Sequence, residues 1–160
     1  MMKILCSLLL MAAMAVQAQS PRGKVVVISL DGFPAYALDD PKLPVPTLRR
    51  LMRNGVYAAM TAVNPTVTWP NHTTMVTGVP ADQHGLLANG TIMRTGTWPP
   101  IKVEPYIDKI KMVRAPTVYD AAHRAGLTTA HVYWVAIENA PTITWASANG
   151  RPWTARSKRK

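Results

Sequence analysis

A continuous apolar run near the start of the chain constrains the fold more than any other feature. Residues 25–30, VVVISL, contain five apolar side chains and one serine, and a charged residue, Asp31, ends the run. A strand that is buried on one face alternates apolar and polar residues, whereas a run without alternation predicts a strand buried on both faces. Such strands are typical of parallel sheets covered by helices. We therefore predict an α/β fold.

The segments that follow alternate between helical and strand patterns. The two clearest helices are predicted from proline in the first turn and glycine at the end, with Pro46 and Gly55 in one and Pro70 and Gly78 in the other. The connecting run at 79–115 is rich in turn signals and is predicted to be mostly loop. The predicted elements are a helix at 45–55, a strand at 56–63, helices at 69–78 and 117–126, and a strand at 127–137.

Residues 1–18 have the pattern of a signal peptide. Lys3 precedes a short apolar run, and small residues surround Ala18, where cleavage is expected. The run is shorter than the roughly 20 residues that a membrane span needs, so we expect no stable membrane anchor and an exported protein, periplasmic or secreted. The sole cysteine, Cys6, lies in this segment. A metal in the mature chain would therefore be bound by carboxylate, imidazole or hydroxyl groups.

The formal net charge of +10 is concentrated toward the C-terminal end. Five of the 18 Lys and Arg residues fall within residues 151–160. Residues 146–160 also lack apolar periodicity, so we expect a disordered or out-of-frame tail, and we place the domain at residues 24–145. The other charges are scattered, which favours a solvated surface over a specific nucleic-acid site.

The predicted elements place two residues where chemistry can occur. Asp31 follows a buried strand, at the sheet edge where ligands bind in open α/β folds, although Asp31-Gly32 could also be an ordinary turn. Thr68 precedes a helix with proline in its first turn, so it is predicted to be the N-cap. A helix N-terminus also favours phosphate, and a bound metal would make a hydroxyl there a nucleophile. Both roles stay open for Thr68.

Three stretches resemble a known family: VISLDGF, PTLRRLMRNGVYAAMTAVNPTVTWPNHTTMVTG and PADQHGLLANG. Together they are similar to the N-terminal part of the type I phosphodiesterase/nucleotide pyrophosphatase family, within the alkaline phosphatase superfamily. The resemblance implies an alkaline phosphatase-like, mostly parallel sheet flanked by helices. It also implies metal-dependent hydrolysis of a phosphodiester or nucleotide pyrophosphate bond in a small-molecule substrate.

The same resemblance assigns site residues and cofactors. Thr68 matches the nucleophile, which also contacts a metal, and Asp31 matches the first metal ligand. Asn89 follows Thr68 by 21 positions and matches the asparagine whose amide binds a phosphoryl oxygen, although Asn89-Gly90 alone is a common turn. Two divalent metal ions, usually zinc in the family, are implied. His72 and His84 are expected to make structural hydrogen bonds.

The chain departs from the family pattern in its other metal ligands. It has no Asp-x-x-x-His motif, no adjacent Asp-His pair and no late histidine, so we expect a domain truncated at its C-terminal side, whose own activity stays open. Asp120 and His123 lie one helical turn apart, and a structural role is favoured for them over a metal pair. Two other functions remain: a phosphomonoesterase or sulfatase-like hydrolase, and a non-catalytic basic fragment that binds polyanions.

Overall fold

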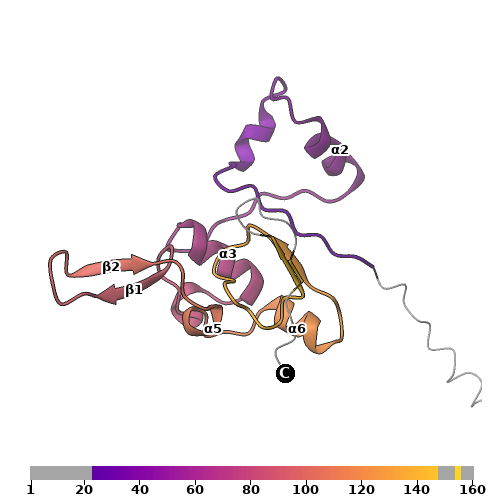
Figure 1. The fold of residues 1–160 in the computed structure, drawn as a ribbon. Helices are drawn as coiled ribbons and strands as arrows, with labels where there is room; N and C mark the ends of the chain where they lie inside the picture. Colours follow the sequence, from indigo (N-terminus) through magenta and orange to yellow (C-terminus); the bar gives the residue numbers. More distant parts are fainter. Residues whose placement is uncertain (1–22, 148–153, 156–160) are drawn as a thin grey trace, which may run out of the picture. The chain divides into compact units, whose positions relative to one another are not determined.

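The computed structural model describes residues 23–147 and 154–155 (Figure 1). The chain forms two units, with the boundary between Phe33 and Pro34, and each is described by itself. The predicted signal peptide lies outside the described residues, as does most of the predicted tail. The elements are η1 (Ala35–Asp39), α2 (Pro46–Asn54), α3 (Thr68–Thr77), α4 (Ala81–His84), β1 (Thr91–Arg94), β2 (Ile101–Glu104), α5 (Lys109–Met112), α6 (Val118–Arg124), β3 (Ala130–Val132), β4 (Trp145–Ser147) and β5 (Thr154–Ala155).

In the first unit, residues 23–30 are extended but belong to no strand of the described residues. Val25 is 89% exposed and Ile28 is 75% exposed. The prediction of a strand buried on both faces is therefore wrong for this structure. A strand buries its faces only as part of a sheet, with neighbours that pair with its backbone and elements that cover it, and neither of the two sheets among the described residues includes this segment.

The second unit begins with η1 and α2. The predicted helix at 45–55 is confirmed, since α2 has proline in its first turn and is followed by Gly55. The guanidinium of Arg49 ties α2 to the preceding segment, because it donates to the backbone oxygens of Leu38 and Asp40. The predicted strand at 56–63 is wrong, since these residues are largely exposed and join no ladder among the residues that the structure describes.

The helices α3 and α6 confirm the other two helix predictions. Helix α3 ends at Gly78, which adopts φ +73° and donates its N–H to the carbonyl of Thr74 at 2.8 Å. A residue in the left-handed region is a common end for a helix, and glycine adopts it without strain. Helix α6 begins with a capping box, in which Thr117 and Asp120 each bind the other's backbone N–H.

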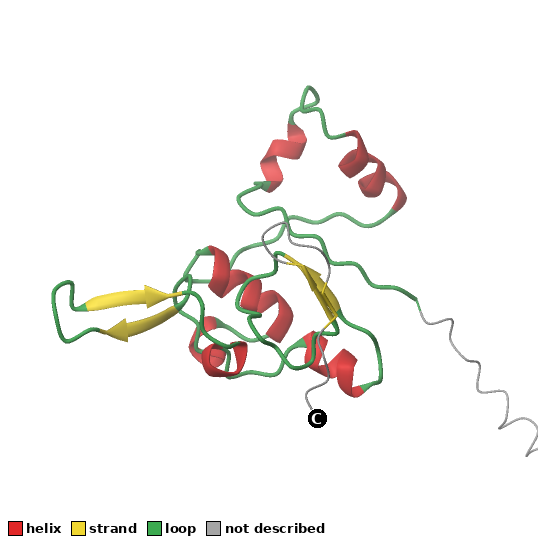
Figure 2. Cartoon of the chain, viewed as in Figure 1, coloured by secondary structure: helices red, strands yellow, loops and turns green. Residues whose placement is uncertain are grey.

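The strands form two small sheets (Figure 2). Strands β1 and β2 form an antiparallel hairpin, with Thr91 opposite Glu104. Strand β3 pairs with β4 in parallel, with Ala130 opposite Trp145, and β5 adds to β4 in the antiparallel direction. The predicted mixed α/β class is confirmed. The predicted mostly parallel sheet is not found in the described residues, where only β3 and β4 are parallel.

The run at 79–115 holds more regular structure than predicted. It contains α4, the hairpin of β1 and β2, and α5, each four-residue element too short to show a helical or strand period. The turn signals in this run mark the ends of these elements. Gly85, for example, adopts φ +82° directly after α4.

Two buried clusters form the core of the second unit. The first contains Leu86, Met112, Val113 and Ala136, and Trp69 of α3 packs against it. The second contains Ile137, Ala140 and Ile143, with Tyr119 of α6 and Trp134 packed against it. The first cluster anchors the beginning of α3, where the candidate nucleophile lies.

Candidate active site

Thr68 is the first residue of α3. The N-cap is Val67, which is extended at φ −115° and ψ 150° and has no side-chain capping bond. The prediction of Thr68 as the N-cap is therefore wrong by one position. The backbone turns into the helix one residue earlier than the proline-based prediction placed it. Thr68 is half-buried and begins the first turn of α3.

Asn89 reaches the same end of α3. Its Oδ1 accepts a hydrogen bond from the backbone N–H of Trp69, at 3.0 Å, and Trp69 directly follows Thr68. A backbone N–H can only donate, so this contact assigns the oxygen of the amide to the helix side. The Nδ2 group of Asn89 is then on the other side of the amide, where it can donate to a ligand.

Gly90 fixes the backbone next to Asn89. It adopts φ +140°, and a Cβ at this position would lie 2.6 Å from the carbonyl oxygen of Glu104 and 2.9 Å from the nitrogen of Pro105. Only glycine allows the end of the hairpin to approach so closely. Asn89 is thus held between the N-terminus of α3 and the base of the hairpin.

Asp31 belongs to the first unit. It lies in a turn closed by a hydrogen bond from the N–H of Phe33 to the carbonyl of Leu30, at 3.3 Å, and Gly32 adopts φ +70°. The side chain of Asp31 is exposed. Of the three predicted site residues, the structure thus brings Thr68 and Asn89 together in the second unit.

The described part of the chain contains no group of three or more His, Cys, Asp or Glu side chains that could hold a metal ion. Asp31 and Thr68 would supply one carboxylate and one hydroxyl, and a site of three or four protein ligands needs more than these. These two residues therefore do not by themselves fit a complete metal centre.

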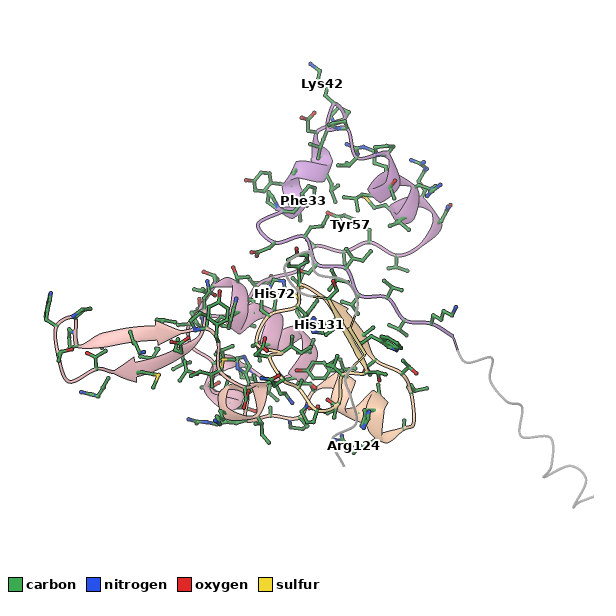
Figure 3. All side chains as sticks on the ribbon, viewed as in Figure 1. Phe33, Lys42, Tyr57, His72, Arg124 and His131 are labelled. Carbon is green, nitrogen blue, oxygen red and sulfur yellow. The ribbon has the colours of Figure 1, made fainter. Side chains whose placement is uncertain are left out.

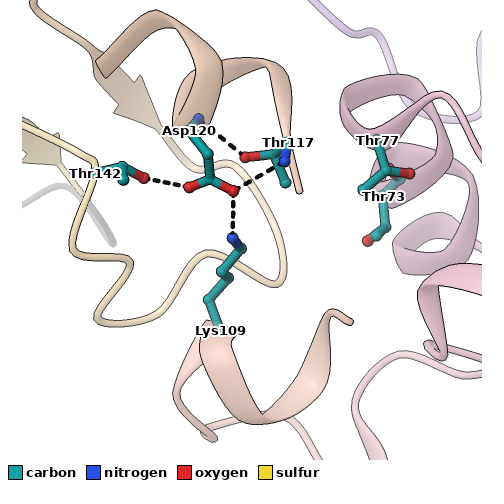
Figure 4. Close-up of polar contacts among 6 residues, drawn as sticks. All are labelled: Thr73, Thr77, Lys109, Thr117, Asp120 and Thr142. Atoms are coloured by element: carbon teal, nitrogen blue, oxygen red, sulfur yellow. Dashed lines mark hydrogen bonds and ion pairs between the residues drawn. The ribbon is translucent and has the colours of Figure 1, made fainter. Parts of the chain in front are cut away.

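Asp120 has the structural role that was favoured for it (Figure 4). Its Oδ2 accepts from Nζ of Lys109 at 2.7 Å and from the N–H of Thr117 at 2.9 Å, and its Oδ1 accepts from the hydroxyl of Thr142. Burial alone would raise the pKa of Asp120. The hydrogen bonds from Lys109, Thr142 and Thr117 outweigh burial and lower the pKa well below its usual range.

Lys109 was missed by the sequence analysis. Its side chain is 9% exposed, and its ammonium group lies 5.3 Å from the centre of the Tyr119 ring. Burial is the main cause that raises the pKa of Tyr119 to about 12. The Thr-x-x-Asp pattern of residues 117–120 is a capping-box signal that could have identified Asp120 as a buried acceptor. No sequence motif around Lys109 indicates that it pairs with Asp120.

The two histidines near α3 make structural hydrogen bonds, as expected. His72, labelled in Figure 3, donates from Nδ1 to the carbonyl of Thr68 at 2.7 Å and packs edge-on against Trp134. His84 accepts at Nδ1 from the N–H of Leu86 at 3.2 Å, so its proton is on Nε2, which lies 3.1 Å from the hydroxyl of Thr74.

We expect the free energy of unfolding to fall as the pH is lowered below about 6.5, in part because of His84. Burial lowers the pKa of this histidine from 6.5, so the unfolded chain binds the proton more readily than the folded chain does. The stabilisation is complete above pH 6.5 and is lost as the pH falls through the folded pKa. Urea unfolding at pH 7.5, 6.5 and 5.5 measures it. His84→Gln should show a smaller pH dependence, and an unchanged dependence would contradict this assignment.

None of the helices in the described part of the chain has the length and apolar character that crossing a bilayer requires.

Comparison with known proteins identifies one family. The family model for type I phosphodiesterase/nucleotide pyrophosphatase matches residues 25–158. Among curated proteins, the human ectonucleotide pyrophosphatase/phosphodiesterase family member 5 is 42% identical over 72 residues. The bis(5'-adenosyl)-triphosphatase enpp4 of Xenopus laevis is 40% identical over 67 residues, and the venom phosphodiesterase of Naja atra is 40% identical over 72 residues. No solved structure matches the chain significantly.

These relatives are much longer than the matched segments. The matches cover 44%, 41% and 44% of this chain but only 15%, 14% and 8% of the human, Xenopus and Naja proteins. The chain therefore spans a small part of the curated relatives that it matches.

Proposed function

The chain belongs to the type I phosphodiesterase/nucleotide pyrophosphatase family, and on this premise we propose that it hydrolyses a phosphodiester or nucleotide pyrophosphate bond with Thr68 as the nucleophile. The observation that carries the proposal is the hydrogen bond from the N–H of Trp69 to Oδ1 of Asn89, at 3.0 Å. It holds Asn89 against the first turn of α3, the helix that Thr68 begins. A hydroxyl, a helix N-terminus and an amide donor are groups that support phosphoryl transfer.

In the proposed reaction, the Thr68 oxygen attacks phosphorus and loses its proton. A bond from Thr68 to phosphorus forms while the bond to the leaving-group oxygen breaks, and the leaving group takes up a proton. Water then attacks phosphorus, the bond from phosphorus to the Thr68 oxygen breaks, and a proton from the water returns to that oxygen, so that the hydroxyl is restored and a phosphomonoester is released. The Nδ2 group of Asn89 would donate to a non-bridging oxygen, where negative charge increases during the transfer.

We also propose that the activity depends on two divalent metal ions, zinc being our assignment, with Asp31 and Thr68 among their ligands. Such ions lower the pKa of a bound hydroxyl and neutralise charge on phosphate. The other ligands of the centre are not assigned.

The proposal also covers the architecture of the sheet and the export of the protein. An alkaline phosphatase-like, mostly parallel sheet flanked by helices is the fold that the resemblance to the family implies, and it belongs to this proposal. Export follows from the signal-peptide pattern of residues 1–18, and the names of the relatives include an ectonucleotide pyrophosphatase and a venom enzyme.

A substrate series tests the proposed function. The purified full chain is incubated with bis-p-nitrophenyl phosphate, p-nitrophenyl phosphate or p-nitrophenyl sulfate, either with added zinc or after chelation. We expect nitrophenol to be released from the diester, and only in the samples that contain added zinc. Preferred turnover of the monoester or the sulfate would instead support another hydrolase of the superfamily, and no turnover of any substrate would reject catalysis by this chain.

We expect Asn89→Asp to lower kcat for the diester by about 10²-fold to 10³-fold, the cost of losing one donor to a developing oxyanion. Aspartate keeps the oxygen that accepts from the N–H of Trp69, so the contact at the start of α3 is retained while the donor is lost. Steady-state kinetics measure kcat, and hydrogen exchange at Trp69 provides the control. A variant with full kcat and a protected Trp69 amide would exclude the proposed role of Asn89.

A further inference from the structure

The side chain of Asn71 makes an unusual number of hydrogen bonds to the segment that precedes α3. Its Oδ1 accepts from the N–H of Val63 at 2.9 Å. Its Nδ2 group lies within hydrogen-bond distance of three backbone oxygens, those of Val63 at 3.1 Å, Pro65 at 2.8 Å and Val67 at 3.1 Å. One amide in the first turn of the helix therefore holds both ends and the middle of residues 63–67.

This segment leads directly into Thr68. It contains its own tight turn, with a hydrogen bond from the N–H of Val67 to the carbonyl of Pro65 at 2.8 Å. Loops outside regular structure ordinarily move more than the elements they connect. The contacts of Asn71 remove that freedom in residues 63–67, so the backbone enters α3 at one defined position.

A second side chain holds Thr68 from within the helix. His72 is 8% exposed, and its Nδ1 donates to the carbonyl of Thr68 at 2.7 Å. Asn71 and His72 are consecutive, so the first fixes the backbone before Thr68 and the second fixes Thr68 itself. Thr68, a half-buried residue, therefore lies on a backbone that is tied on both sides.

We propose that Asn71 is a positioning residue for Thr68, which aligns the hydroxyl with phosphorus by ordering residues 63–67. This proposal rests on the proposed function. The role requires one acceptor and two N–H donors in one short, planar group, and asparagine alone has these at this length. Aspartate has the same size but no N–H donor, and leucine has neither donor nor acceptor.

Asn71→Asp and Asn71→Leu test the proposal in the full chain with bis-p-nitrophenyl phosphate and zinc. A small displacement of a reacting group costs about 10²-fold in rate, so we expect kcat to fall by about that factor in both variants, with KM changed less than about twofold. Thr77→Val is the matched control, because it removes a bond of 2.8 Å to the carbonyl of Thr73 at the other end of α3. It should retain kcat within about twofold.

Hydrogen exchange gives a second readout that needs no turnover. The N–H of Val67 should lose protection in both Asn71 variants, whereas the N–H of Val63 should stay protected in Asn71→Asp, which keeps its acceptor, and lose protection in Asn71→Leu. Unchanged exchange at Val67, or a kcat equal to that of Thr77→Val, would overturn the proposal. If the unmodified chain has no turnover, the proposed function fails, and exchange at Val67 still decides whether Asn71 orders the segment.

Discussion

Thr68→Ala should abolish phosphodiester turnover, with a loss in kcat on the order of 10⁴-fold to 10⁶-fold, as is found when a covalent nucleophile is removed. Alanine has no oxygen to bond to phosphorus, so no phosphothreonine can form. It is also the best helix former, and Thr68 is only half-buried at the first position of α3. The measurement is kcat of the full chain with bis-p-nitrophenyl phosphate and zinc.

Thr68→Ser is the matched control for this result. Serine keeps the hydroxyl and loses only a methyl group, so it should retain a substantial part of the turnover. Circular dichroism and urea unfolding should show that both variants are folded. Turnover that persists in a folded Thr68→Ala protein would show that another group attacks phosphorus.

The second large effect concerns stability. Asp120→Asn should lower the free energy of unfolding by about 3 to 5 kcal/mol, the usual cost of breaking a buried ion pair by removing one partner. The Lys109 and Asp120 side chains are 9% and 11% exposed and lie 2.7 Å apart, so the substitution would leave the ammonium group buried without its counter-charge. Urea unfolding at pH 7 measures the loss.

A double-mutant cycle separates the ion pair from the other contacts of Asp120. Lys109→Met should also destabilise the chain, because it leaves the carboxylate buried. The double variant Lys109→Met, Asp120→Asn should cost less than the two single changes together. Because the pKa of Asp120 is lowered in the fold, its contribution to the free energy of unfolding is present above about pH 4 and is lost as the pH falls further. The free energy of unfolding of Asp120 variants should therefore depend less on pH in this acidic range. Additive single effects would contradict the coupling.

The helices could be predicted because their signals are local. Proline and glycine mark both ends of α2 and α3, and these residues act on the backbone within one turn. The predicted strands at 25–30 and 56–63 were wrong, because a strand depends on partners that its own residues do not specify. The same limit applies to the hairpin, whose register depends on pairing between residues that are 7 to 13 positions apart.

The candidate site was predicted in part. The resemblance to the family, with the spacing that matches it, assigned Asn89 and Thr68 to one site. In the structure, Asn89 accepts a hydrogen bond from the N–H of Trp69, the residue after Thr68. The proposed role of Asn71 was not predicted, because its contacts are to backbone groups of residues 63–67. Backbone groups are the same in almost every residue, so no sequence pattern identifies such contacts. The Lys109–Asp120 pair was missed for a related reason, since it joins two short elements that only tertiary packing brings together.

The exposed segment at 25–30 has a consequence for handling the protein. It combines β-branched residues with no charge, proline or glycine, which is the composition of segments that aggregate by forming intermolecular sheets. Lys24 and Asp31 flank it, and when two copies pair in parallel and in register, like charges lie side by side and oppose the association. We therefore expect Asp31 to oppose aggregation of this segment, in addition to its proposed role at the metal. Precipitation of an Asp31 variant at high concentration would reflect the loss of this protection and would not by itself report on metal binding.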